Sequence, residues 1–199
     1  MKLWQAAFLG ACVLAAGCAS NTSDKPAPSS KVQQGVGANG AKTVTSLPEK
    51  VACDTDPRCP VLSAAWSSAK AGQATLTVGM PGQQAEITSV EFHFSGMDAV
   101  RLSLPARNQP PAPGYPATVF DVPLRVLSQI AYGQRSWLRA SLSNGRTVDQ
   151  TLDDGDTRGK ALDVMTDFLT AVDAAGGSTG AKQQRKGGLL DIFGGDGDQ

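Results

Sequence analysis

The middle of the chain alternates apolar and polar residues with a period of two, which is the pattern of a strand that buries one face. The alternation is clearest around Val90, Phe92 and Phe94, whose neighbours Glu91 and His93 are polar. Shorter stretches repeat it before and after this segment. The strands predicted in this way cover residues 61–67, 74–78, 86–95 and 100–104, with Gly96-Met97-Asp98 connecting the last two.

A hairpin is predicted further along the chain, around Ser143-Asn144-Gly145. A two-residue Asn-Gly turn would place Ala140 opposite Asp149 and mix the apolar and polar faces. A three-residue turn with Gly145 in the left-handed conformation places Ala140 opposite Val148 instead. The apolar sides then coincide, so we expect this second register for the strands around 138–142 and 148–152.

Two segments have the three-to-four spacing of amphipathic helices. The first begins at Asp121 or Val122, just before Pro123, and ends at Gly133. The second covers residues 158–174 and ends at Gly176-Gly177. An acidic group precedes the second helix, where negative charge complements the helix dipole. The apolar faces comprise Leu124, Leu127, Ile130 and Ala131 in the first helix, and Leu162, Met165, Leu169 and Val172 in the second.

These elements predict one α+β domain over residues 49–175, with an antiparallel sheet of about five to six strands packed by the C-terminal helix and one shorter helix. Residues 18–48 and 176–199 are rich in Gly, Ser, Thr and Lys and have few large apolar residues. Such segments cannot offset the entropy of ordering, so we expect a flexible linker and a disordered Gly-rich tail. We expect Trp66, Trp137 and Tyr132 in the core or half-buried in the sheet.

Charge excludes one class of partner. The chain has 18 Lys and Arg against 18 Asp and Glu and no strongly basic cluster. A nucleic-acid-binding domain needs a basic surface to neutralise phosphates. We therefore expect no nucleic-acid partner.

The N-terminus carries a targeting signal. Lys2 is followed by an apolar run that ends near Gly17, shorter than the about 20 residues that a membrane-spanning helix needs. This is the shape of a signal peptide. The run ends in Leu14-Ala15-Ala16-Gly17-Cys18, which resembles the lipobox of bacterial lipoproteins over residues 1–20. One departure is Ala15, at a position where that family favours Leu.

The resemblance implies that residues 1–17 are removed and that Cys18 receives a diacylglyceryl group and an acyl chain. Ala19 after the cysteine then favours transport to the outer membrane. We expect the domain to face the periplasm, with exposure on the cell surface as the alternative. Two acyl chains suffice for stable anchoring, so the membrane partner would be reached through lipid. The alternative is an ordinary signal peptidase site near Ala16 or Ala19.

Export to an oxidising compartment would also affect Cys53 and Cys59, the two cysteines that follow Cys18. Cys53 and Cys59 flank a short segment that contains the turn-forming pair Asp56-Pro57. In an oxidising compartment we expect them to form a short-loop disulfide. A redox pair or a metal site are the alternatives, but the spacing is wider than Cys-x-x-Cys and the chain has a single histidine.

Catalytic motifs are weak in this chain. His93 could act as a general base, but no nucleophile motif accompanies it. The run Asp153-Asp154-Gly155-Asp156 could bind calcium, but it lacks the EF-hand spacing, so we interpret it as a turn before a helix. We predict no cofactor, no metal and no catalytic residue.

Two segments favour protein contacts. Residues 105–116 contain five prolines and Tyr115, which predicts a stiff crossover or a presented surface. The tail places four large apolar residues between glycines, and burying them requires a partner, a membrane surface or the domain itself. These candidate contact residues are Leu189, Leu190, Ile192 and Phe193.

Together these features predict a non-catalytic, lipid-anchored envelope protein that acts by protein-protein contacts with an envelope partner, as an accessory of an assembly or secretion system. A periplasmic or surface ligand-binding or inhibitor module is the second hypothesis. An envelope hydrolase is the third.

Overall fold

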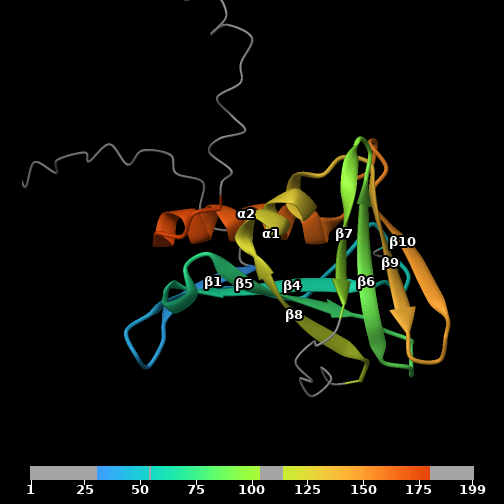
Figure 1. The fold of residues 1–199 in the computed structure, drawn as a ribbon, viewed down its shortest axis with the longest axis horizontal. Helices are drawn as coiled ribbons and strands as arrows, with labels where there is room; N and C mark the ends of the chain where they lie inside the picture. The colour runs from blue at the N-terminus through green and yellow to red at the C-terminus, as the bar shows by residue number, and fades with distance from the viewer. Residues whose placement is uncertain (1–30, 54, 104–113, 180–199) are drawn as a thin grey trace, which may run out of the picture.

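The computed structural model describes residues 31–53, 55–103 and 114–179 of the chain. The described part contains two antiparallel β-sheets and two α-helices in an α+β arrangement (Figure 1). Both helices lie on one face of the larger sheet, and the smaller sheet stands across one end of that layer. The fold class expected from the sequence is therefore confirmed, with two sheets where one was predicted.

The larger sheet has six strands in the order β1-β2-β4-β5-β8, with the short β3 also paired to β4. Alternation is regular in β4, where Leu62, Ala64 and Trp66 are buried and their neighbours are half-buried. Most of the buried apolar residues of this sheet belong to the core that the helices also contribute to. The strands are β1 (Val32–Val36), β2 (Lys42–Ser46), β3 (Glu49–Lys50), β4 (Val61–Ser67), β5 (Gln73–Gly79) and β8 (Ala117–Pro123).

The smaller sheet has four strands in the order β10-β9-β6-β7. Its inner face buries Val90, Phe92, Leu138, Ala140 and Leu152, each of them fully inaccessible to solvent. These side chains close one end of the core that the helices and the larger sheet share. The strands are β6 (Ile87–Phe94), β7 (Met97–Ser103), β9 (Ser136–Leu142) and β10 (Thr147–Asp153).

The helices are α1 (Leu124–Tyr132) and α2 (Lys160–Ala175). Helix α2 packs over β1 to β4, and α1 packs against α2, β5 and β8. The apolar faces predicted for both helices are buried. The predicted ends are close but not identical, because Asp121 and Val122 belong to β8 and Pro123 is the residue at which α1 begins to turn.

The predicted register of the hairpin is confirmed. Val148 pairs with Ala140, and the N–H of Leu142 donates to the carbonyl of Arg146 across a three-residue turn. Gly145 has a φ of 80°, the left-handed conformation that this turn needs. The neighbouring hairpin is tighter than predicted, since Met97 and Asp98 already belong to β7 and only Ser95-Gly96 connects it to β6.

The predicted boundaries of the domain are wrong at both ends. Residues 32–36 and 42–46 form β1 and β2 at the edge of the larger sheet, so the flexible linker cannot extend to residue 48. Only Val32, Val44 and Ser46 are buried in these two strands, and so sparse an apolar signal resembles that of a linker. At the other end Thr179 is 2% exposed and donates from its N–H and hydroxyl to Asp173 of α2. Among the described residues, the folded domain therefore includes β1 at one end and Thr179 at the other.

Candidate functional site

Several candidate residues fall outside the described part of the chain. Cys18, with the lipobox, and the apolar tail residues Leu189, Leu190, Ile192 and Phe193 are among them. Of the proline-rich stretch, residues 105–113 are also outside, and Tyr115 packs its ring over the face of Gly79. The lipidation site and the contact role of the tail therefore stay predictions.

Cys53 and Cys59 form the predicted disulfide, with their Cα atoms 5.4 Å apart. The bridge closes the connection between β3 and β4, where the N–H of Asp56 donates to the carbonyl of Cys53 and the N–H of Cys59 donates to that of Asp56. Cys59 is 1% exposed and belongs to the core. The arrangement fits a structural staple, because a buried cysteine at a sheet edge is not presented to a redox partner.

A more promising surface is the outer face of the four-stranded sheet, which we call the ladder face. Its side chains come from alternate positions of β7, β6, β9 and β10, the positions that point away from the core. The strand registers arrange them in three rows. The rows are Ser103-Ser89-Ser141-Thr147, Arg101-Glu91-Arg139-Asp149 and His93-Trp137-Thr151.

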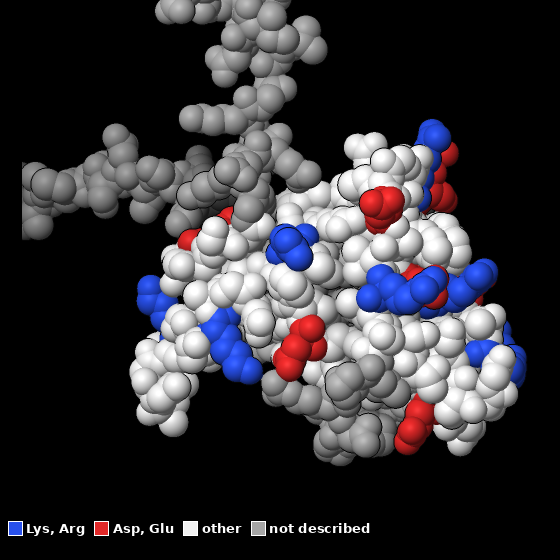
Figure 2. All heavy atoms as spheres, viewed as in Figure 1, with Lys and Arg blue, Asp and Glu red and all other residues white. Residues whose placement is uncertain are grey.

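The central row alternates positive and negative charge across all four strands. Arg101 Nε lies 2.9 Å from Glu91 Oε1. Arg139 donates from Nε and Nη2 to the two oxygens of Asp149, each at 2.7 Å. The hydrogen bonds from Arg139, together with its positive charge, lower the pKa of Asp149. Asp149 therefore carries its negative charge near neutral pH. Figure 2 shows basic and acidic side chains close together over this sheet.

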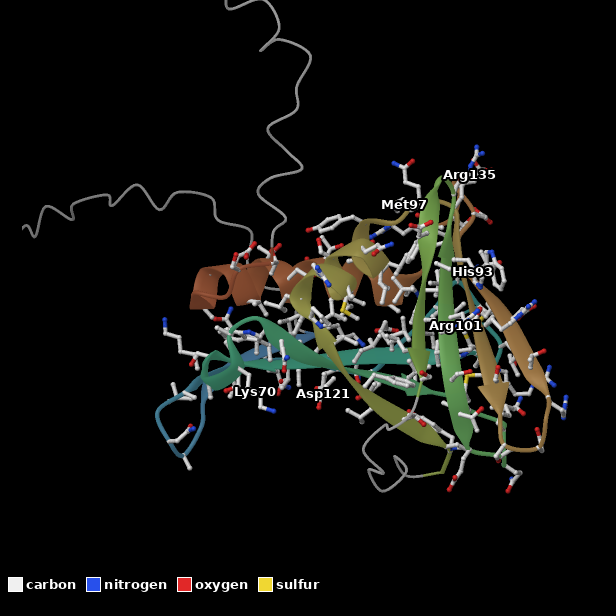
Figure 3. All side chains as sticks on the ribbon, viewed as in Figure 1. Lys70, His93, Met97, Arg101, Asp121 and Arg135 are labelled. Carbon is white, nitrogen blue, oxygen red and sulfur yellow. A yellow bond between two sulfur atoms is a disulfide. The ribbon has the colours of Figure 1, made fainter. Side chains whose placement is uncertain are left out.

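His93 and Trp137 stack beside the charged row. Their ring centroids lie 3.9 Å apart with the planes 3° from parallel, and the guanidinium carbon of Arg139 lies 5.2 Å from the centre of the indole ring. His93 Nε2 is 3.4 Å from Glu91 Oε2, yet within the described residues it has no hydrogen bond of acceptable geometry. Figure 3 shows His93 and Arg101 on this sheet.

Among the described residues, no side-chain nucleophile is hydrogen-bonded to His93. A base needs a nucleophile or a proton donor within hydrogen-bond reach. The groups around His93 are instead an indole ring and a carboxylate. The half-buried position predicted for Trp137 is confirmed, and Trp66 is buried at 3% exposure. The prediction for Tyr132 is wrong: it is 40% exposed, because it is the last residue of α1 and points out of the core.

The second candidate is a polar cleft of about 640 Å³ between the end of α1, the start of β9 and the first half of α2. One of its lining residues is Arg158, whose guanidinium pairs with Asp153 at 3.3 Å and with Asp163 at 2.9 Å. The same group also donates to the carbonyl oxygen of Ala131 at the end of α1 and to Thr166. Arg158 therefore connects α1, α2 and β10 through its side chain.

Two charged groups in this cleft have no hydrogen bond or ion pair with any part of the chain that the structure describes. They are Arg135, the residue before β9, and Asp167 on α2. Arg135 has a φ of 45°, the only positive value among the described residues other than glycine, and its side chain lies against Gly155. Left-handed backbone at a bulky residue costs free energy, and such positions cluster at functional sites.

The acidic turn before α2 is a structural turn, as predicted. The carboxylate of Asp154 accepts from the N–H groups of Thr157 and Asp156, and these hydrogen bonds lower its pKa. The carboxylate of Asp153 accepts hydrogen bonds from Arg158 and from the N–H of Gly155. Within the described residues no group of three or more His, Cys, Asp or Glu side chains is placed to hold a metal ion.

The sequence pattern indicates His93 as a candidate residue, but it does not predict the charged row or the cleft. The four charged residues of the row sit at the polar positions of predicted strands, so the hairpin register alone could have paired Arg139 with Asp149. The other pairings needed the order of the strands, which places β9 beside β6 although β7, β8 and α1 lie between them along the chain. The cleft depends on contacts between three separate elements.

Neither helix among the described residues is long and apolar enough to span a membrane. Comparisons of the chain with protein-family models, with curated proteins and with solved structures each find no match.

Proposed function

We propose that the protein is a lipid-anchored, non-catalytic component of the bacterial cell envelope, and that it acts through protein-protein contacts made by the ladder face. The lipobox-like sequence ending at Cys18 supports the anchor. The disulfide between Cys53 and Cys59 fits an exported protein, since such bonds persist in oxidising compartments.

The observation that carries the proposed contact role is the ladder face itself. Its residues form a partly preorganised surface, because ion pairs and ring stacking join neighbouring side chains and restrict their conformations. Arg and Trp are enriched in protein interfaces, where a preorganised side chain loses less entropy on binding. A charged row of this kind would give specificity and orientation to a partner more than raw affinity.

The anchor is tested separately from the contact role. The full chain is expressed in a bacterial envelope and the N-terminal peptide of the mature protein is analysed by mass spectrometry. A mature N-terminus at Cys18 that carries acyl chains supports the anchor, and Cys18→Ser should release the protein from the membrane fraction. An unmodified N-terminus near Ala19 would indicate ordinary signal peptidase cleavage instead.

The contact role is tested by capturing envelope proteins that crosslink to this protein. Three versions are compared: the full chain, the full chain with Arg139→Glu on the ladder face, and a chain truncated after Thr179. The truncation keeps the buried Thr179 cap on Asp173 but removes the apolar tail. Capture that is lost in Arg139→Glu and kept in the truncated chain supports the ladder face. Capture that is lost only on truncation would assign the contact to the tail.

The polar cleft favours a second candidate function, a ligand-binding module. Arg135 and Asp167 line one cavity, do not pair with each other and have opposite charges. A small ligand that carries both an acidic and a basic group could engage the two at once. Calorimetric titration of the full chain with free amino acids and short peptides tests this, with Arg135→Ala and Asp167→Asn each expected to weaken binding and the exposed Arg125→Ala expected to leave it unchanged.

A further inference from the structure

The order of charges on the ladder face has a symmetry that indicates its partner. Across the order β7-β6-β9-β10 the central row is Arg101, Glu91, Arg139 and Asp149, so the charges alternate as plus, minus, plus, minus. Rotation by 180° about an axis parallel to the strands, lying between β6 and β9 in the plane above the face, reverses this order. The reversed row is minus, plus, minus, plus, which is the charge complement of the original.

We propose that the partner of the ladder face is a second copy of this chain, packed face to face through this two-fold axis. The proposal rests on the proposed contact role of the ladder face and names its partner. In the dimer Arg101 of one copy lies over Asp149 of the other, and Glu91 lies over Arg139. Each contact occurs twice, as an isologous interface requires.

The two flanking rows obey the same symmetry. The rotation places His93 over Trp137 of the other copy, and Ser89 over Ser141 of the other copy. The first contact joins half-buried rings, and the second joins hydroxyl groups that can donate and accept. A rotation about an axis perpendicular to the strands would instead place each charge over itself. The arrangement of side chains therefore selects one of the two ways in which the faces could pack.

Each charged side chain of the central row keeps capacity for a second partner, although it is already paired within its own face. The side chain of Arg101 is 71% exposed and is joined to Glu91 through Nε, which leaves its terminal nitrogens accessible. Arg139 and Asp149 are 43% and 49% exposed. An ionised carboxylate offers about four lone-pair sites, so a pair within one face can extend into a network across two.

The size of the face predicts a weak dimer. Four strands spaced about 4.8 Å apart, each about seven residues long, present roughly 450 Å² per copy, or about 900 Å² in total. Stable interfaces bury about 1,200–2,000 Å², so association through this face is reversible and concentration-dependent. Attachment of both copies to one membrane would raise their effective concentration and favour pairing.

The test uses sedimentation velocity on the full mature chain with Cys18→Ser, over concentrations from about 5 to about 500 µM, which brackets weak association. We expect the sedimentation coefficient to rise with concentration, and Arg139→Glu to weaken association at least tenfold. Lys70→Glu, on the turn after β4 and far from the ladder face, is the matched control and should associate like the wild type.

A full inversion separates a specific interface from a folding defect. The variant Arg101→Glu/Glu91→Arg/Arg139→Glu/Asp149→Arg keeps every pair within the face and every pair across the axis. It should self-associate like the wild type, whereas Arg139→Glu alone should not.

Three results would overturn the proposal: a monomeric wild type over the whole range, unchanged association in Arg139→Glu, or loss of association in the fully inverted chain. If the wild type stays monomeric while Arg139→Glu still abolishes capture of a different envelope protein, the second copy is wrong and the contact role of the ladder face survives. If neither self-association nor capture depends on Arg139, both fail.

Discussion

Arg139 and Asp149 face each other directly across β9 and β10, joined by two hydrogen bonds of 2.7 Å. The pairing follows from the three-residue turn at Ser143-Asn144-Gly145, because that turn sets the register of the hairpin. The same register places both side chains on the outer face of the sheet. A turn residue at the tip of the hairpin thus determines the charge order of the ladder face.

The first prediction concerns the pH dependence of this pair. Hydrogen bonds from Arg139 lower the pKa of Asp149, so the pair stabilises the fold above the unfolded-state pKa of about 3.9, and the effect is lost as pH falls through the lower folded-state value. We expect Asp149→Asn to lower the urea midpoint slightly at pH 7 and not at pH 2.5. A difference between the variant and the wild type that persists at pH 2.5 would contradict a stabilising ion pair.

Reduction of the disulfide should destabilise the domain. Closing so short a loop between Cys53 and Cys59 contributes about 2 kcal/mol by restricting the unfolded chain, which corresponds to a melting temperature lower by about 4–8 °C in the reduced protein. Thermal unfolding followed by circular dichroism, with and without a reductant, measures the shift. Thiol labelling of the untreated protein checks the bond, and reactive cysteines there would show that the bridge does not form.

Gly159 should not tolerate a side chain. It precedes α2, and a Cβ at this position would lie 2.7 Å from the backbone nitrogen of Ala52 and 2.9 Å from the carbonyl oxygen of Leu152. Backbone atoms cannot rotate away, so Gly159→Ala should cost about 1–3 kcal/mol of unfolding free energy, measured by urea titration.

Gly72→Ala is the matched control for Gly159→Ala. Among the described residues no atom lies within 4 Å of the place that its new methyl group would occupy, so the stability of this variant should hardly change. Equal stability of the two variants would contradict the close packing of Gly159 against the backbone.

Arg158 should be more important for stability than its partly exposed position suggests. It joins Asp153 of β10, Asp163 and Thr166 of α2, and the carbonyl end of α1. We expect Arg158→Ala to cost about 2 kcal/mol, because it leaves a half-buried carboxylate and a helix-end carbonyl without a partner. Arg158→Lys should recover only part of this, since a lysine cannot contact all of these groups.

The matched control for Arg158 is Arg125→Ala, an exposed arginine on α1 whose loss should change stability by less than about 0.5 kcal/mol. Chemical denaturation of Arg158→Ala, Arg158→Lys and Arg125→Ala measures the three changes in unfolding free energy. If Arg158→Ala and Arg125→Ala are equally stable, the cluster around Arg158 is a solvated surface and not a structural junction.

The elements that could be predicted from the sequence are those with a local signal. The alternation in β4, β5 and β6, the apolar stripes of α1 and α2, and the register set by Gly145 are all properties of neighbouring residues. Elements that depend on contacts between distant residues could not be predicted in this way. β1 and β2 bury three side chains between them, and only their place at the edge of the larger sheet makes them strands.

For the candidate site too, single positions could be predicted from the sequence, but contacts between distant elements could not. His93 and Trp137 are visible as polar-face and aromatic positions of predicted strands, but their stacking requires β6 and β9 to be neighbours. The charges of Arg135 and Asp167 come together only because the end of α1, the start of β9 and α2 enclose one cleft. Long-range order of strands and helices is not encoded in a period of two or of 3.6 residues.

Whether the ladder face is the contact surface of the anchored protein is tested most directly by site-specific photo-crosslinking in living envelopes. A photo-crosslinking amino acid is placed in the full chain at Thr147, exposed on the ladder face, or at Gln73, exposed on β5 of the larger sheet. We expect a discrete crosslinked species from Thr147 and none from Gln73. No adduct at Thr147, or equal adducts at both positions, would contradict a contact role for the ladder face.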